Sequence, residues 1–168
     1  MSLPHILLAL LVTLIWGVNF VVIKVGLQDF PPLLFCALRF ALAALPLLLL
    51  RGPLPAPAWR IVQIGVLLGV VKFGLLFVGM HLGMPAGLSS LVLQSQVFFT
   101  VLIAALLLGE RPSVRALAGL LLAAGGLLLI GLQRPLGDSL LGFVLVIAAA
   151  LAWAFAKCGM FSRKSGGM

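Results

Sequence analysis

Charged side chains, and acidic ones above all, are scarce in this sequence. Of its 168 residues only 8% are charged, against about 25% in ordinary soluble domains. Hydrophobic residues make up 64%, and so few charges cannot form the polar shell that a water-soluble core requires. The composition therefore excludes a water-soluble globular fold. It predicts an all-α integral membrane protein whose apolar exterior faces lipid.

The residues of acid–base, redox and metal chemistry are also rare. The sequence has no Tyr and two His, and its cysteines, Cys36 and Cys158, lie in separate apolar segments without a CxxC spacing. We interpret both cysteines as buried thiols, and we expect no metal site and no cofactor. No nucleophile–base set and no phosphate-binding loop is visible, so we expect no catalytic residues and no enzyme activity.

Long apolar stretches dominate what remains. Six of them reach the length needed to cross a hydrocarbon core of about 30 Å, and each is bounded by Pro, Gly or charge. The short connections between them predict antiparallel neighbours in one bundle of about six transmembrane helices. We expect the first span to be retained, because no Lys or Arg precedes it as in a secretory signal peptide. The predicted spans are residues 4–27, 33–50, 61–82, 86–108, 114–132 and 139–161.

Basic residues outnumber acidic ones by eleven to three, which in a soluble protein would suggest a nucleic-acid partner. Here they stand singly among apolar runs, so we expect no nucleic acid to bind. Alternate connections carry most of them, and the positive-inside rule then places the N-terminus in the cytoplasm. Arg134 is the single basic residue of the opposite connections. The residues on the predicted cytoplasmic side are Arg51, Arg60, Arg111, Arg115, Arg163 and Lys164.

Four basic residues lie inside predicted spans, where a charge costs roughly 2.5–3.5 kcal/mol on insertion scales. Lys72 is near the centre of its span, so we predict that it lines a polar cavity. Arg39 either pairs with carbonyl groups or a carboxylate, or lines the same cavity. Lys24 either shapes the charge of that cavity or extends to the headgroups, and we expect Lys157 to extend to them. No acidic residue lies at mid-span, which favours an anionic or zwitterionic solute over a bare cation.

Uncharged polar residues extend this pattern. Trp16 and Asn19 are three apart and share one helix face. Ser89, Gln96 and Thr100 fall on one stripe of the fourth span, and a second stripe, with Gln94, lies on the opposite side. We favour Gln96 for the cavity, the alternative being a hydrogen bond between helices. The predicted substrate-binding residues are Trp16, Asn19, Lys24, Arg39, Lys72 and Gln96.

Pairs of small residues predict where helices approach closely. Gly65 and Gly69 form a G-x-x-x-G in the third span, and Gly119 with Ala123 forms a similar pair in the fifth. We interpret both as sites of tight packing within the chain, with a dimer face as the alternative.

Several runs together resemble the EamA family of the drug/metabolite transporter superfamily. The resemblance implies ten helices in two inverted five-helix repeats around a central substrate site. It also implies export of cysteine-pathway metabolites such as O-acetylserine and cysteine across the bacterial inner membrane. The runs are Trp16–Leu27, Pro31-Pro32 with Leu38-Arg39-Phe40, Gly83–Leu88 with Leu91–Thr100, and Gly109-Glu110-Arg111 with Ala118-Gly119 and Gly125-Gly126.

On that scheme the chain contains one repeat and the start of the next. Residues 1–132 form the first repeat, 139–161 the first helix of an inverted second repeat, and 162–168 a cytoplasmic tail. Trp153 then corresponds to Trp16, as the tryptophan of the first helix of each repeat. Because the remaining helices are missing, we expect a truncated exporter, and its activity as a chain on its own stays open. The alternatives are a non-transporting membrane module, or a half-transporter that acts on assembly with a second copy or with a missing C-terminal half.

Overall fold

The computed structural model describes residues 2–49, 57–109, 112–133 and 140–161. Within those ranges all the elements are helices, which confirms the predicted all-α membrane fold. In chain order they are α1 (Leu3–Asp29), α2 (Pro32–Leu49), α3 (Ala58–Gly65), the π-helix η1 (Val66–Lys72), α4 (Phe73–His81), α5 (Ala86–Leu93), α6 (Gln96–Leu108), α7 (Val114–Gln133) and α8 (Leu140–Phe161).

Each of the six predicted spans coincides with a helix or a continuous series of helices. Four of these are long and apolar enough to cross a membrane: Leu3–Asp29, Ala58–His81, Ala86–Leu106 and Leu140–Cys158. The other two predicted spans correspond to the shorter apolar helices Pro32–Pro46 and Val114–Leu129. Arg51, Glu110, Arg111, Arg134, Asp138 and the 162–168 tail lie outside the described residues.

The third span changes its winding at its centre. Seven residues, Val66–Lys72, form a π-helix between the α-helical segments α3 and α4. π-Helical turns are rare and are frequently found at functional sites. Here the π-helix ends at Lys72, which is buried.

The fourth span is long and apolar enough to cross a membrane, as predicted, but a two-residue turn that the sequence analysis did not predict interrupts its helix. Helix α5 ends at Leu93, and α6 starts at Gln96. Across the break the N–H groups of Gln94 and Ser95 donate to carbonyls three residues back, at 3.0 Å each. This tighter winding interrupts the α-helical ladder without any Pro or Gly, so no residue of the segment indicates it.

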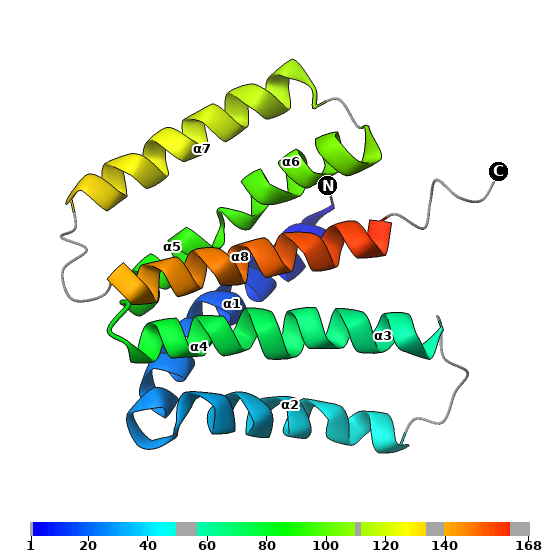
Figure 1. Cartoon of the computed structure of the whole chain (residues 1–168), viewed down its shortest axis with the longest axis vertical. Helices are drawn as coiled ribbons and strands as arrows, with labels where there is room; N and C mark the ends of the chain where they lie inside the picture. Colours follow the sequence, from blue (N-terminus) through cyan, green and yellow to red (C-terminus); the bar gives the residue numbers. More distant parts are fainter. Residues whose placement is uncertain (1, 50–56, 110–111, 134–139, 162–168) are drawn as a thin grey trace.

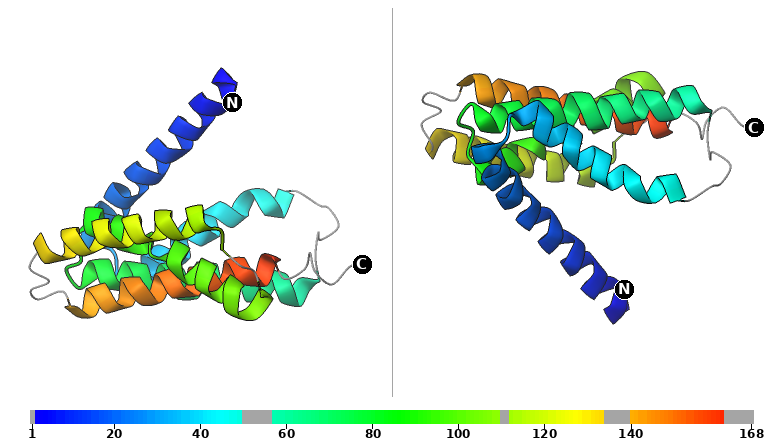
Figure 2. Two further views of the ribbon diagram at one scale, coloured as in Figure 1. Left: turned by 90° about the horizontal axis from the view of Figure 1, so that it is seen from above. Right: turned by 90° about the horizontal axis from the view of Figure 1, so that it is seen from below.

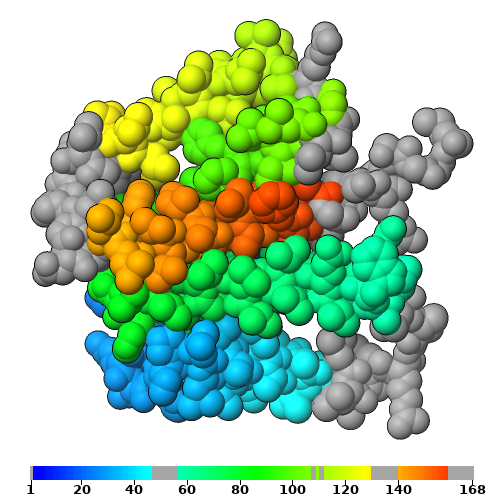
Figure 3. Space-filling model, in the orientation of Figure 1, coloured from blue at the N-terminus to red at the C-terminus, as the bar shows by residue number. Residues whose placement is uncertain are grey.

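The long helices lie side by side, with α8 between α3–α4 on one side and α5–α6 on the other (Figure 1). Helices α2 and α7 form the two edges of this layer in that view, and the space-filling view shows the same order on the surface (Figure 3). Helix α1 leaves the layer at a steep angle (Figure 2). Its buried residues, Ile23 and Leu27, therefore belong to its C-terminal half.

Helices α4 and α8 approach so closely that the backbone of each leaves no room for a Cβ on the facing glycine of the other. A Cβ atom on Gly79 would lie 2.8 Å from the carbonyl oxygen of Gly142, and one on Gly142 would lie 2.7 Å from that of Gly79. Of the small residues predicted to pack tightly, Gly65 and Gly119 have no atom of another element within 4 Å of an added Cβ, whereas at Gly69 the Phe40 ring of α2 lies 3.9 Å away. The small residues that bring helices together here are single glycines on two different helices, not a pair on one helix.

Candidate substrate-binding site

A cavity of about 220 Å³, here called the central cavity, lies where α1, α2, η1–α4, α5 and α8 meet. It contains four of the six predicted site residues: Trp16, Asn19, Arg39 and Lys72. The full lining is Ile15, Trp16, Asn19, Phe20, Arg39, Lys72, Phe73, Leu76, Leu93 and Trp153.

Lys72 is the most deeply buried charge of the described chain, with 6% of its surface exposed. Its ammonium nitrogen lies 3.4 Å from the centroid of the Phe73 ring and 4.4 Å from that of Trp153. A desolvated cation–π contact contributes about 2 kcal/mol or more, so two rings offset much of the cost of placing a charge at this depth. The rings stabilise the charge without neutralising it.

Arg39 supplies a second cation to the same cavity. Its guanidinium carbon lies 4.9 Å from the centroid of Phe73 and 6.0 Å from that of Phe77. The Nη1 atom is buried and has no hydrogen-bond partner among the described residues. Asp29, the acidic residue within the described ranges, is exposed at the end of α1. The cavity thus combines two cations with a buried donor that lacks an acceptor, which is the chemistry of an anion site.

Tryptophans form two walls of the central cavity. Trp16 of α1 and Trp153 of α8 face each other with ring centroids 5.9 Å apart and planes inclined by 39°. Trp153 was not among the predicted site residues, although the sequence analysis matched it to Trp16 as the corresponding position of the second repeat. The correspondence between the two tryptophans could have indicated Trp153 as a site residue, because the two rings are in contact.

Gln96 and Lys157 lie together, beside the central cavity rather than in its lining. Gln96 is 5% exposed, and its Oε1 accepts a hydrogen bond of 2.7 Å from the Lys157 ammonium. The expectation that Lys157 extends to the headgroups was wrong, because its side chain turns inward to Gln96 on α6. As the stripe predicts, Gln94 is exposed while Ser89 and Gln96 are buried.

Lys24 is exposed, and the structure does not bring it to the central cavity. It is five residues beyond Asn19, which is about 140° around an α-helix, so the two side chains leave α1 in different directions.

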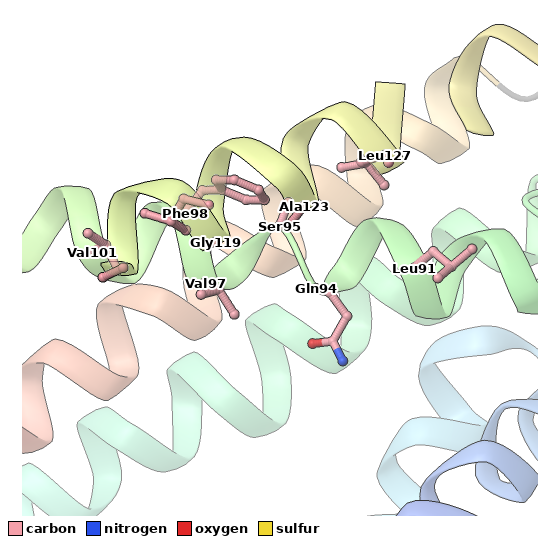
Figure 4. Close-up of a pocket in the computed structure, with 12 residues that line it drawn as sticks. Leu91, Gln94, Ser95, Val97, Phe98, Val101, Gly119, Ala123 and Leu127 are labelled. Carbon is pink, nitrogen blue, oxygen red and sulfur yellow. The ribbon is translucent and has the colours of Figure 1, made fainter. Parts of the chain in front are cut away.

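A larger space of about 680 Å³ separates α5–α6 from α7 (Figure 4). Its walls are mostly apolar, with Phe98, Val101, Ala123 and Leu127 among the lining residues, and no charged side chain contributes to it. Size alone would favour this groove, but the central cavity has the charged and aromatic groups that can orient a polar solute.

Comparison with known proteins places this fold and cavity in a family. A model of the EamA-like transporter family matches residues 3–132. The chain is 44% identical to the "probable amino-acid metabolite efflux pump" of Escherichia coli (strain K12) and 43% identical to the protein of that name in Salmonella typhimurium (strain LT2). It is 33% identical to the "uncharacterized transporter YoaV" of Bacillus subtilis (strain 168).

These alignments cover 90% to 94% of this chain but 52% to 54% of the relatives, so the chain spans about half the length of the curated relatives it matches. No solved structure matches it. The apolar helices and the buried cationic cavity define a multi-pass membrane protein. The chain belongs to the EamA-like transporter family.

Proposed function

We propose that this chain binds small amino-acid-type metabolites, of the class of O-acetylserine and cysteine, and exports them across the bacterial inner membrane. The observation that carries the proposal is the pairing of Lys72 and Arg39 in one cavity with aromatic walls and no neutralising carboxylate among the described residues. Two relatives that share over two fifths of its sequence are named as amino-acid metabolite efflux pumps, which supports this substrate class.

The cavity offers a complementary group for each part of such a solute. A carboxylate between Lys72 and Arg39 would give the unpartnered Nη1 an acceptor. An ammonium group can lie against the Trp16 ring or donate a hydrogen bond to the amide oxygen of Asn19. At about 220 Å³ the space is smaller than the roughly 300–1,000 Å³ of sites for drug-sized ligands, so it suits small metabolites.

The proposed orientation places the N-terminus in the cytoplasm. The first residues of α3 and α7 and the last of α8 lie toward the same end of the layer (Figure 1). Arg60 and Arg115 belong to the first turns of α3 and α7. Positive charges at one end of several spans mark the cytoplasmic side.

The direct test is metabolite export. Cells that express the chain should hold less O-acetylserine, and should release more of it, than cells with an empty vector. Arg115→Gln is the matched control, because this exposed residue of α7 lies outside the cavity and should leave export unchanged. Equal metabolite content with and without well-expressed chain would overturn export by the chain on its own.

A second candidate, transport only on assembly with a second chain, is favoured by the exposure of Trp16. This cavity residue is 54% exposed, so a single chain leaves that side of the site open. The test is flux in proteoliposomes at increasing protein-to-lipid ratio. Flux proportional to the ratio supports the single chain, and a steeper rise supports assembly. If the chain shows neither binding nor flux at any ratio, it is a non-transporting module.

Trp153 should be the aromatic residue on which binding depends most, because its ring contacts Trp16 and lies near the Lys72 ammonium. We expect Trp153→Leu to weaken binding of O-acetylserine by about tenfold, since it removes a cation–π contact and an aromatic wall together. Trp153→Phe should retain most of the affinity. Calorimetry on the chain in nanodiscs measures both, and equal affinities of the two variants would argue against an aromatic role.

A further inference from the structure

A second polar cluster lies beside the central cavity, and the proposed function does not use it. The Lys157 ammonium of α8 donates to Gln96 Oε1 of α6 at 2.7 Å. The Thr100 hydroxyl donates to the Gln96 backbone carbonyl at 2.7 Å and lies 3.5 Å from Oε1. Gln96 is the first residue of α6 after the break, and the side chains of the cluster come from α6 and α8.

Trp153 connects this cluster to the central cavity. The Lys157 ammonium lies 4.6 Å from the centroid of the Trp153 ring, and the Lys72 ammonium lies 4.4 Å from the same centroid. The two cations are therefore neighbours around one indole ring. A solute that leaves Lys72 and Arg39 along Trp153 next meets the Lys157 ammonium.

The Lys157 ammonium is hydrogen-bonded to a neutral group, and no described carboxylate neutralises its charge. An ammonium has three N–H donors, and among the described residues the structure records one acceptor for them, a neutral amide oxygen. If the hydrogen bond served only to connect α6 and α8, an uncharged donor would do so equally well. The retained positive charge of Lys157, held beside a neutral amide, therefore points to an anion.

We propose that Lys157, Gln96 and Thr100 form a second anion station, adjoining the central cavity across the Trp153 ring. Its ligand is a small anionic group. Where the proposed function holds, that group is the carboxylate of the exported metabolite, which Lys157 receives as it leaves Lys72 and Arg39. Gln96 is then the residue that holds the ammonium in place while the station is empty.

Iodide quenching of Trp153 tests the station without any transport. The variant Trp16→Phe/Trp59→Phe leaves Trp153 as the single tryptophan of the chain. Iodide should gather at the two cations and quench strongly. Gln96→Glu, which keeps the shape of the side chain but neutralises Lys157, should lower the iodide quenching constant about threefold, because a paired ammonium no longer attracts anions. Quenching by neutral acrylamide should not change.

Lys157→Gln should act in the same way, and Lys157→Arg should retain iodide quenching. Arg115→Gln, an exposed cation on α7, is the matched control and should change neither quencher. Unchanged iodide quenching in Gln96→Glu would overturn the station. An equal change of iodide and acrylamide quenching would also overturn it, because that result indicates a tether whose loss opens the structure.

Transport provides the second readout. In proteoliposomes Gln96→Glu should slow O-acetylserine flux about tenfold, while affinity for the central cavity stays within about twofold. Wild-type chain that shows neither binding nor flux would defeat the proposed function, and the iodide result would still decide whether the station exists. If the wild-type chain transports and Gln96→Glu leaves that flux unchanged, only the role of the station in export is overturned.

Discussion

Lys72→Gln is expected to weaken binding of a carboxylate metabolite by about 100-fold, because it removes a charged donor from a desolvated site. Lys72 is 6% exposed, and bulk water cannot replace its charge. Calorimetry of O-acetylserine binding to the chain in nanodiscs measures the loss. Flux in proteoliposomes should fall in proportion, since the proposed path begins at this ammonium.

The carboxamide of O-acetylserine provides the control for charge. It has the same shape without the negative charge, so its affinity should differ little between wild type and Lys72→Gln. Lys72→Arg should restore part of the carboxylate affinity, because the charge returns with different geometry. An equal loss for both ligands would show that Lys72 maintains the structure of the cavity. No loss for either would show that the carboxylate binds elsewhere.

The depth of a charge within its span was the most informative signal in the sequence. It singled out Lys72 and Arg39, and the structure places both in one cavity. Depth says nothing about the neighbouring helix, however. Lys157 lies near the end of its span, where extension to the headgroups is favourable, and only the position of Gln96 on α6 explains why it turns inward.

Local changes in helix winding were the second feature that the sequence did not predict. Periodicity placed Gln96 on a buried stripe, yet it could not reveal the break at Gln94 and Ser95 that makes Gln96 the start of a helix. The π-helix before Lys72 was invisible for the same reason, since its sequence Val66–Lys72 contains no residue that demands a wider turn. Both departures lie in segments that pack against α8, and the sequence of a single span contains no information on that neighbour.

Gly142→Ala is expected to destabilise the protein by about 1–3 kcal/mol, the usual consequence of overpacking a helix contact. The added methyl would lie 2.7 Å from the Gly79 carbonyl oxygen and 3.3 Å from Met84 Cβ. Both obstacles are backbone or backbone-proximal atoms, so no flexible side chain can move aside. Helix α8 must therefore shift away from α4, and Trp153 moves with it. Thermal unfolding in detergent should show a lower midpoint, accompanied by weaker metabolite binding.

Gly65→Ala is the matched control, because it adds the same methyl group where no atom lies within 4 Å. Replacing Gly by Ala in a helix usually stabilises it by about 0.5–1 kcal/mol, so this variant should unfold at the same or a higher temperature. Equal midpoints for Gly142→Ala and wild type would mean that α4 and α8 are not held in contact at this point. Binding depends on the same contact, because α4 follows Lys72 directly and α8 contains Trp153. A stable Gly142→Ala variant with full affinity would therefore contradict both the packing and the site built on it.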